Sequence, residues 1–320
     1  MKLVMMGTGS FAEPTFRKLL ESSHRVVGLV TQPDRATGSQ RGSTRQAGQP
    51  MKELAIERGI PVLQPESINT PDGVTALRAL NPDLVVVAAY GQILSKDILS
   101  VAPLGGINVH ASLLPKYRGA APINWAIYHG ETQSGVTIIR MTTGLDAGDM
   151  LVQEAIDILP NETAGELEAR LGPLGAKLAI ETVDKLAQGP SAGVPQDKGQ
   201  VTKAPKLTKE HGLIDWSRPA AGVVNQIRAM QPWPTAYTYL HRQGHEPLRV
   251  IVCSAMVTGR ASDGIVGQAV ADGSRLFACS ADGWIEIIEL QPAGKRRMSA
   301  QDFLRGNAIP PDARFGSENA

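Results

Sequence analysis

The sequence has few cysteines and almost no net charge. Cys253 and Cys279 are the two cysteines in 320 residues, and their spacing fits no metal site, which favours free thiols in a cytosolic protein. The net charge is +1, from 32 basic and 31 acidic side chains, so a nucleic-acid or membrane partner would need a local basic patch. The N-terminal apolar run, residues 3–6, is too short for a signal peptide, and no run approaches a membrane span. The length of 320 residues and the 42% hydrophobic content predict a globular protein. At this length two domains are favoured over a single one.

The first half alternates short apolar runs with longer amphipathic stretches. The runs predicted as strands are residues 3–6, 26–31, 84–88, 107–110 and 136–141, and the stretches predicted as helices are 11–22, 49–58, 74–81 and 121–129. This alternation is typical of an α/β fold with a mostly parallel, Rossmann-like sheet covered by helices.

The second half changes its pattern. A capping box at residues 163–166 predicts a helix that reaches Gln188, with an interruption at Gly172-Pro173. The apolar runs 248–253, 265–270, 276–279 and 284–290 are separated by Asp-Gly turns, which predicts a small antiparallel, OB-like β-barrel. The sequence thus predicts a catalytic domain at 1–189, a linker rich in glycine, proline and polar residues at 190–206, and a β domain at 207–320.

Asn108 and His110 stand two residues apart in the predicted strand 107–110. The period of two places both side chains on one face of that strand, with Val109 on the other. An amide donor can stabilise an oxyanion and an imidazole can move a proton, and acyl transfer needs both. Ser-Leu-Leu-Pro at 112–115 then ends the strand, because proline fixes φ and lacks an N–H for the ladder.

These residues resemble the folate-dependent formyltransferases. That family shares an Asn-x-His strand, a Ser-Leu-Leu-Pro segment with a Tyr/Trp-Arg-Gly loop, and an Asp within a Gly-x-Asp-x-Gly-type turn. The same three parts occur here in order, at 108–110, 112–119 and 144–148. The resemblance implies that Asn108, His110 and Asp146 form a catalytic trio.

The resemblance also implies 10-formyltetrahydrofolate as the co-substrate, with no metal at the catalytic site. Asp146 alone would be read as a turn former, but from the end of the predicted strand 136–141 it can reach and orient the imidazole. A zinc site at His110 and Asp146 is the alternative, and no third ligand has suitable spacing.

Two segments are implied to bind the folate. The first follows the predicted central strand, at the edge where α/β sheets bind ligands, and its backbone, with the side chains of Ile93 and Leu94, is implied to receive the pterin ring. An ordinary strand-to-helix turn is the alternative for this segment. The implied contacts are Tyr90, Gly91, Gln92, Ile93 and Leu94 in the first segment and Ser112, Leu113, Leu114 and Pro115 in the second.

A glycine-rich turn supports a different class of enzyme. Residues 7–12, Gly-Thr-Gly-Ser-Phe-Ala, fit a dinucleotide fingerprint, and Asp34 lies near the place of a ribose-binding acid. An NAD(P)-dependent oxidoreductase is therefore the competing interpretation. Asp34 lies past the predicted strand, however, and the formyltransferases have a comparable turn with proline where Gly9 stands. We therefore predict a plain tight turn, in which Gly9→Pro is tolerated provided that φ is near −65°.

A long polar loop, residues 32–50, carries three arginines among glycines. Loops of this length are uncommon unless they are functional, and mobile cations suit contact with phosphate. A solvated loop without a ligand is the alternative for this segment.

The chain continues well beyond the length of the short, purine-pathway members of the family. Residues 213–216, 227–234 and 290–298 resemble the C-terminal domain of methionyl-tRNA formyltransferases. This implies charged initiator tRNA as the partner of a cytoplasmic enzyme, with neither a membrane nor an obligate protein partner. The implied tRNA contacts are Arg35, Arg41, Arg45, Lys295, Arg296 and Arg297.

Two further alternatives stay open. A sugar-amine formyltransferase of the same family would keep the Trp-Pro segment at 233–234 but would not need the basic loop. A non-enzymatic RNA-binding protein would need no catalytic trio.

Overall fold

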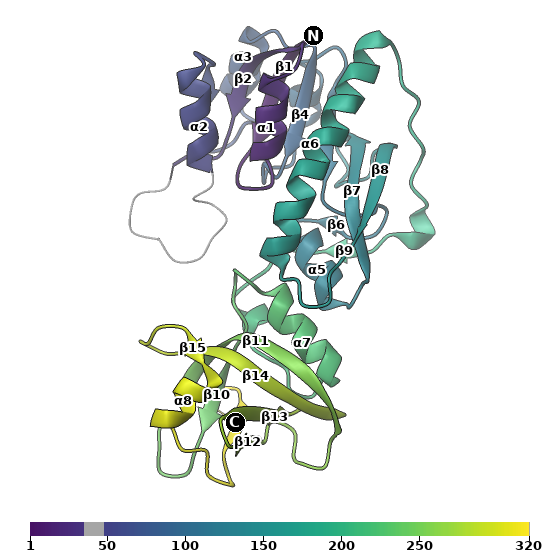
Figure 1. Ribbon diagram of the computed structural model, residues 1–320. Coiled ribbons are helices and arrows are strands. Elements are labelled where there is room, and N and C mark those ends of the chain that lie inside the picture. The colour runs from purple at the N-terminus through teal and green to yellow at the C-terminus, as the bar shows by residue number, and fades with distance from the viewer. Residues whose placement is uncertain (35–47, 320) are drawn as a thin grey trace. The chain divides into compact units, whose positions relative to one another are not determined.

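The computed structural model describes residues 1–34 and 48–319 and contains two compact units. Unit 1 comprises residues 1–123, 133–158 and 166–206, and unit 2 comprises residues 124–132, 159–165 and 207–320. Each unit has its own large sheet (Figure 1). Two short stretches within the predicted catalytic range 1–189 are thus part of unit 2.

Unit 1 is built on a seven-stranded sheet of order β3-β2-β1-β4-β5-β7-β8. Strands β1 to β5 pair in parallel, whereas β7 and β8 run antiparallel. This confirms the predicted α/β fold with a mostly parallel sheet. The strands are β1 (Lys2–Gly7), β2 (Arg25–Val30), β3 (Val62–Leu63), β4 (Leu84–Ala88), β5 (Gly106–His110), β7 (Gln133–Arg140) and β8 (Met150–Asp157).

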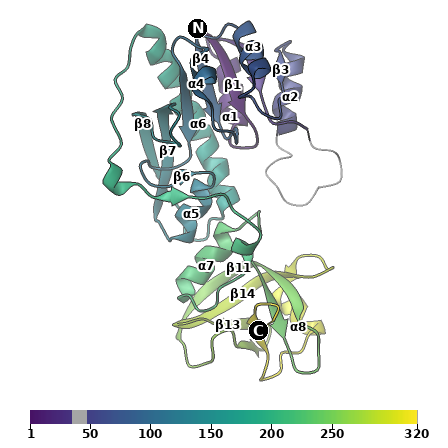
Figure 2. The same ribbon diagram turned by 180° about the vertical axis from the view of Figure 1, so that it is seen from behind.

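Helices cover both faces of this sheet (Figures 1 and 2). Two of them begin at side-chain caps: the hydroxyl of Thr70 accepts from the Gly73 N–H, and that of Ser95 accepts from the Ile98 N–H. The helices of unit 1 are α1 (Glu13–Leu20), α2 (Gly48–Glu57), α3 (Pro71–Ala79), α4 (Lys96–Leu99) and α6 (Ala164–Gln188).

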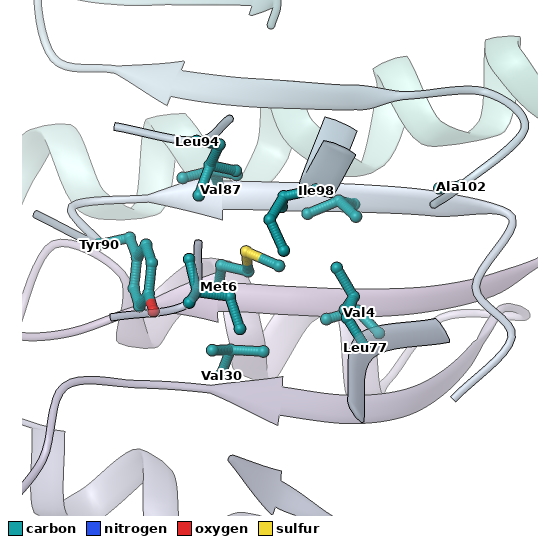
Figure 3. Packing of buried hydrophobic residues seen from close by; sticks show 11 residues of the cluster. Val4, Met6, Val30, Leu77, Val87, Tyr90, Leu94, Ile98 and Ala102 are labelled. Carbon is teal, nitrogen blue, oxygen red and sulfur yellow. The ribbon is translucent and has the colours of Figure 1, made fainter. Parts of the chain in front are cut away.

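Alternate residues of the central strands form one buried cluster (Figure 3). On the central strands, every second side chain points to α3 and α4, because successive side chains of a strand point to opposite faces of the sheet. Tyr90, two residues past β4, lies in the same cluster and is only 2% exposed. The cluster includes Val4, Met6, Val30, Leu77, Val85, Val87, Tyr90, Leu94 and Ile98.

Helix α6 is continuous, so the predicted interruption at Gly172-Pro173 is wrong. Its small residues allow a close approach: a Cβ at Gly172 would lie 3.2 Å from Pro14, and one at Gly175 would lie 2.8 Å from Val109 Cγ1. Packing of this helix against the rest of unit 1 therefore outweighs the hydrogen bond that Pro173 removes.

Unit 2 contains the predicted antiparallel β-barrel. Its strand order is β12-β13-β14-β11-β10-β16, with β15 paired to β14. The strands are β10 (Tyr237–His241), β11 (Leu248–Ala261), β12 (Ala269–Asp272), β13 (Arg275–Cys279), β14 (Gly283–Pro292), β15 (Met298–Ser299) and β16 (Arg314–Gly316), and the helices are α5 (Pro122–Tyr128), from Asn124 onward, α7 (Ala220–Ala229) and α8 (Ala300–Gly306).

The barrel closes just before β12, where a strand was predicted at 265–270. The Phe315 N–H donates to the Gly267 carbonyl, and Gln268 pairs with Arg314. Gly267 has a φ of +83°, and a Cβ there would lie 2.3 Å from the Phe315 carbonyl oxygen. The regular strand therefore starts only at Ala269, because Gly267 makes the turn that brings β16 alongside.

The turn after β1 is tightly packed. A Cβ at Gly7 would lie 2.8 Å from both Ala12 Cβ and the Ala88 carbonyl oxygen. The N–H groups of Ala12 and Glu13 donate to the Gly9 carbonyl, at 3.1 and 3.2 Å. Because these two donors at the start of α1 already have a partner inside the turn, they are not directed at a dinucleotide phosphate.

Gly9 gives the first prediction and corrects an expectation. Its φ is +95°, so the condition for tolerating proline is not met, because proline requires a φ near −65°. We expect Gly9→Pro to lower the free energy of unfolding by more than about 1 kcal/mol, measured by urea denaturation. Gly306→Ala, at a position with no neighbour within 4 Å of a Cβ, is the control and stays within about 0.5 kcal/mol. A Gly9→Pro variant as stable as the control would contradict the backbone described here.

Candidate active site

Strand β5 carries the first two members of the predicted trio. Val109 lies against Gly175 of α6, so Asn108 and His110 lie on the opposite face of the sheet. His110 is 5% exposed. Both residues stand at the carboxyl end of a parallel strand, where open α/β sheets bind ligands.

Asp146 follows β7 and joins the other two. Its Oδ1 accepts from Asn108 Nδ2 at 3.2 Å, and its Oδ2 accepts from the Gly119 N–H at 2.9 Å. The same Oδ2 lies 3.7 Å from His110 Nδ1. The structure therefore brings together the three residues that were predicted from segments 38 positions apart.

The tautomer of His110 follows from its second contact. His110 Nε2 lies 2.9 Å from the carbonyl oxygen of Tyr117, and a carbonyl can only accept. Nε2 therefore carries a hydrogen, and Nδ1, which faces Asp146, is the nitrogen that can take or give a proton. Tyr117 has a left-handed φ of +61°.

This arrangement can support transfer of an acyl group. Asn108 Nδ2 has two hydrogens, of which one is donated to Asp146 and the other can be donated to a developing oxyanion. The imidazole next to it can manage a proton. Among residues 1–34 and 48–319, no group of three or more His, Cys, Asp or Glu side chains is placed to hold a metal.

The first predicted folate segment is divided between core and surface. The side chains of Tyr90 and Leu94 lie in the buried cluster, whereas Ile93 is 63% exposed. Gly91 has a φ of +84° and open space around a Cβ. Gln92 accepts from the Ile68 N–H at 3.0 Å and donates to the Glu66 carbonyl at 3.2 Å. These contacts leave the backbone near Gly91 and the side chain of Ile93 as the accessible parts of this segment.

The second predicted folate segment is held by hydrogen bonds to its surroundings. Ser112 Oγ donates to the Lys116 carbonyl at 2.7 Å, and the Leu114 N–H donates to Thr137 Oγ1 at 3.1 Å. Leu113 and Pro115 are partly exposed, whereas Ser112 and Leu114 are buried. This segment therefore forms a fixed turn between β5 and the loop that holds Tyr117.

The segment predicted as a linker contacts this site. Strand β9 (Lys203–Ala204) pairs in parallel with β6 (Arg118–Gly119). The Tyr117 N–H donates to Thr202 Oγ1 at 2.8 Å, and Gln196 Nε2 donates to the carbonyls of Asp146 and Gly148. Gln196 and Thr202 could not be predicted from the sequence, because a segment rich in glycine, proline and polar residues has no periodicity that would place them.

The predicted RNA contacts lie in two regions. Arg35, Arg41 and Arg45 lie outside the described residues. Lys295, Arg296 and Arg297 are exposed on the connection between β14 and β15. Arg297 forms an ion pair with Glu289, which raises the pKa of that guanidinium.

One histidine outside the candidate site is largely buried. The His24 side chain is 7% exposed, and its Nε2 lies 2.9 Å from Asp184 Oδ1. The carboxylate partner explains how a polar ring is accommodated there. Both cysteines are free thiols, as predicted. None of the helices within residues 1–34 and 48–319 has the length and apolar character needed to cross a membrane.

Comparison with known proteins assigns this chain to a family. Residues 1–183 match the family model described as formyl transferase, and residues 206–308 match the formyl transferase C-terminal domain. The chain belongs to the formyl transferase family.

Relatives match over the full length of the chain. A methionyl-tRNA formyltransferase of Citrifermentans bemidjiense is 45% identical over 320 residues, covering 100% of this chain and 98% of its own. A methionyl-tRNA formyltransferase of Acidobacterium capsulatum is 46% identical over 318 residues, covering 99% of this chain and 100% of its own.

Solved structures share the fold at low sequence identity. WlaRD, a sugar 3N-formyl transferase crystallised in the presence of dTDP and 5-N-formyl-THF, gives a TM-score of 0.66 at 16% identity, covering 92% of this chain and 99% of its own. HypX from Aquifex aeolicus, in complex with tetrahydrofolic acid, gives a TM-score of 0.59 at 16% identity, covering 95% of this chain and 46% of its own.

Tyr90 gives the second prediction. Burial raises the pKa of its phenol to about 12, because the phenolate is disfavoured away from water. The unfolded chain loses this proton near about pH 10, so the folded state loses stability as the pH rises from about 10 to 12. The hydroxyl has no hydrogen-bond partner among the described residues. We therefore expect Tyr90→Phe to reduce this alkaline loss and to keep stability at neutral pH within about 1 kcal/mol of wild type.

Chemical denaturation of both proteins at neutral pH and across the alkaline range measures this effect. Tyr237→Phe, at a half-exposed tyrosine of unit 2, is the control that keeps the alkaline loss. A large destabilisation of Tyr90→Phe at neutral pH would show that the hydroxyl has a partner.

Proposed function

We propose that this protein transfers the formyl group of 10-formyltetrahydrofolate to the α-amine of methionine esterified to initiator tRNA. The observation that carries the proposal is the full-length match to methionyl-tRNA formyltransferases, which includes the C-terminal domain at residues 206–308. The contacts among Asn108, His110 and Asp146 support it, because they place a hydrogen-bond donor for an oxyanion next to an imidazole that can accept a proton.

The proposed reaction begins when the amine nitrogen attacks the formyl carbon. The carbonyl oxygen becomes an oxyanion, and the second N–H of Asn108 Nδ2 donates to it. His110 Nδ1 accepts the proton that leaves the amine nitrogen, assisted by Asp146, whose Oδ2 lies 3.7 Å away. The oxyanion then collapses to a carbonyl, the bond from the formyl carbon to N10 of the folate breaks, and N10 takes the proton that His110 accepted. The products are the formylated amine and tetrahydrofolate.

The accessible parts of the two predicted folate segments would bind the co-substrate. The backbone near Gly91 and the side chain of Ile93 would receive the pterin ring, and the fixed turn at residues 112–115 would border the formyl group. The proposed chemistry requires no metal. We place this activity in the cytoplasm, where charged tRNA is available.

The direct test is incubation with labelled 10-formyltetrahydrofolate and methionyl initiator tRNA. An aminosugar nucleotide, offered in a parallel reaction, tests the alternative acceptor. Formylation of the aminosugar but not of the tRNA would overturn the proposal in favour of a sugar-amine formyltransferase.

The trio gives the third prediction. Removing one preorganised oxyanion donor lowers kcat by about 10²–10³-fold, and removing a general base lowers it by about 10²–10⁴-fold. We expect losses of these sizes for Asn108→Ala and His110→Ala. Asp146→Asn keeps the size of the side chain but removes the charge that orients the imidazole, so kcat falls and its pH profile shifts.

Steady-state kinetics and circular dichroism of each variant check this prediction. Asn307→Ala, which removes an amide that donates to the Phe303 carbonyl in unit 2, is the matched control and keeps wild-type kcat. Near-normal turnover in any of the three variants would remove that residue from the mechanism.

The basic connection between β14 and β15 gives the fourth prediction. Among the described residues, Lys295 and Arg296 have no carboxylate partner, whereas Arg297 pairs with Glu289. Each phosphate contact adds about one to the slope of log affinity against log salt concentration. We expect Lys295→Ala/Arg296→Ala to raise KM for tRNA, to flatten this salt dependence and to leave KM for the folate unchanged.

Kinetics with both substrates at two salt concentrations measure these effects. Lys18→Ala/Lys177→Ala removes the same charge from exposed positions of α1 and α6 and is the control. If the two double variants behave alike, the basic connection does not contact tRNA.

A further inference from the structure

Asp146 lies in an exposed loop and has an unfavourable backbone conformation. Its loop connects β7 to β8, and residues 142–145 of that loop are exposed. Asp146 itself has a left-handed φ of +46°, which side chains of L-residues rarely adopt. A carboxylate on such a loop keeps one position only if neighbouring groups hold its backbone.

Gln196 supplies two bonds to that backbone. Its Nε2 donates to the carbonyl of Asp146 and to that of Gly148, both at 2.8 Å. The two bonds use both hydrogens of the amide. They fix the carbonyls on either side of Ala147 and so hold the turn that presents the carboxylate.

Arg118 fixes the orientation of Gln196. Its Nε and Nη2 both donate to Gln196 Oε1, at 3.0 and 2.7 Å. A guanidinium can only donate, so the amide oxygen must face Arg118 and the amide nitrogen must face the two carbonyls. A flipped amide would place donor against donor and acceptor against acceptor.

These contacts close a ring around Asp146. Gly119, next to Arg118 in β6, donates its N–H to Asp146 Oδ2 at 2.9 Å. Gln196 therefore holds the backbone of Asp146. Gln196 is in turn held by Arg118, the residue before Gly119. Its segment is anchored separately, because Val194 and Met150 exchange backbone hydrogen bonds of 2.8 and 2.9 Å.

We infer that Gln196 is a positioning residue for formyl transfer, which sets the Asp146 carboxylate against His110. The inference rests on the proposed function. Among the described residues, Gln196 forms no hydrogen bond to Asn108 or His110, and it acts on the site through the turn at 146–148. Its loss therefore lowers kcat while leaving substrate binding intact.

Gln196→Glu tests the donor function of the side-chain amide apart from its acceptor function. The variant keeps the size and the acceptor for Arg118, but it loses both donors and points a carboxylate oxygen at two carbonyls. Displacement of a catalytic group by about 1 Å can cost 10²-fold in rate. We expect kcat to fall by about 10²-fold, with a shifted pH profile, and both KM values to stay within about threefold of wild type, as expected when ground-state binding is preserved.

Asp197→Asn is the matched control. Asp197 is the neighbouring residue, and it accepts from the Gly199 N–H and from Gln200 Nε2 without contacting the Asp146 turn. This variant keeps wild-type kcat and pH profile. A loss of kcat in Asp197→Asn as large as that in Gln196→Glu would overturn the inference, because any disturbance of the segment would then suffice.

A second pair of variants protects the test against misfolding. Arg118→Lys keeps the charge but replaces the two-pronged donor with a single ammonium, so we expect a smaller loss of kcat in the same direction. The double variant Gln196→Glu/Arg118→Lys is no slower than Gln196→Glu alone, because both act through one chain of contacts. Multiplicative losses would contradict this.

The wild-type acceptor test separates failure of this inference from failure of the proposed function. All ratios of variant to wild type are measured with the acceptor that the wild-type protein formylates, tRNA or aminosugar nucleotide. If kcat of Gln196→Glu stays within about threefold of wild type, or falls only together with the melting temperature and with both substrate affinities, Gln196 has no positioning role.

Discussion

The candidate site depends on the interactions of one group, the carboxylate of Asp146. One of its oxygens binds the Asn108 amide, and the other binds the Gly119 N–H and faces His110. The Asp146 side chain is only 11% exposed, and a carboxylate buried to this extent needs such donors to keep its charge away from water. One side chain thereby connects the end of β5 to β6 and to the loop after β7, and the positions of Asn108 and His110 depend on the same anion.

Much of this organisation could be predicted from the sequence. The alternation of apolar runs predicted the mostly parallel sheet, and the spacing of Asn108 and His110 predicted that both share one face of β5. The resemblance to the formyltransferases added Asp146. The sheet and the shared face of β5 could be predicted because strand periodicity is a local property. The role of Asp146 stays a prediction, although the structure places its carboxylate next to Asn108 and His110.

The features that were missed depend on contacts between distant segments. Gln196 bonds to residues about 50 positions earlier, and nothing in its neighbourhood marks it. Pro173 does not interrupt α6, because the helix packs closely on Pro14 and Val109. The φ of Gly9 and the pairing of Gly267 with Phe315 likewise depend on atoms that other segments of the chain bring close. The local sequence does not specify those atoms.

The pairing of Val194 with Met150 has a consequence for solubility. Strand β8 ends the order of the sheet in unit 1, and an outermost strand offers unpaired backbone groups to other chains. Val194 occupies those groups at Met150, the first residue of β8. The stretch that reaches the turn at Asp146 thus also shields the start of an exposed sheet edge. Loosening it would expose unpaired backbone groups to other chains, so substitutions that disturb this stretch would also promote aggregation.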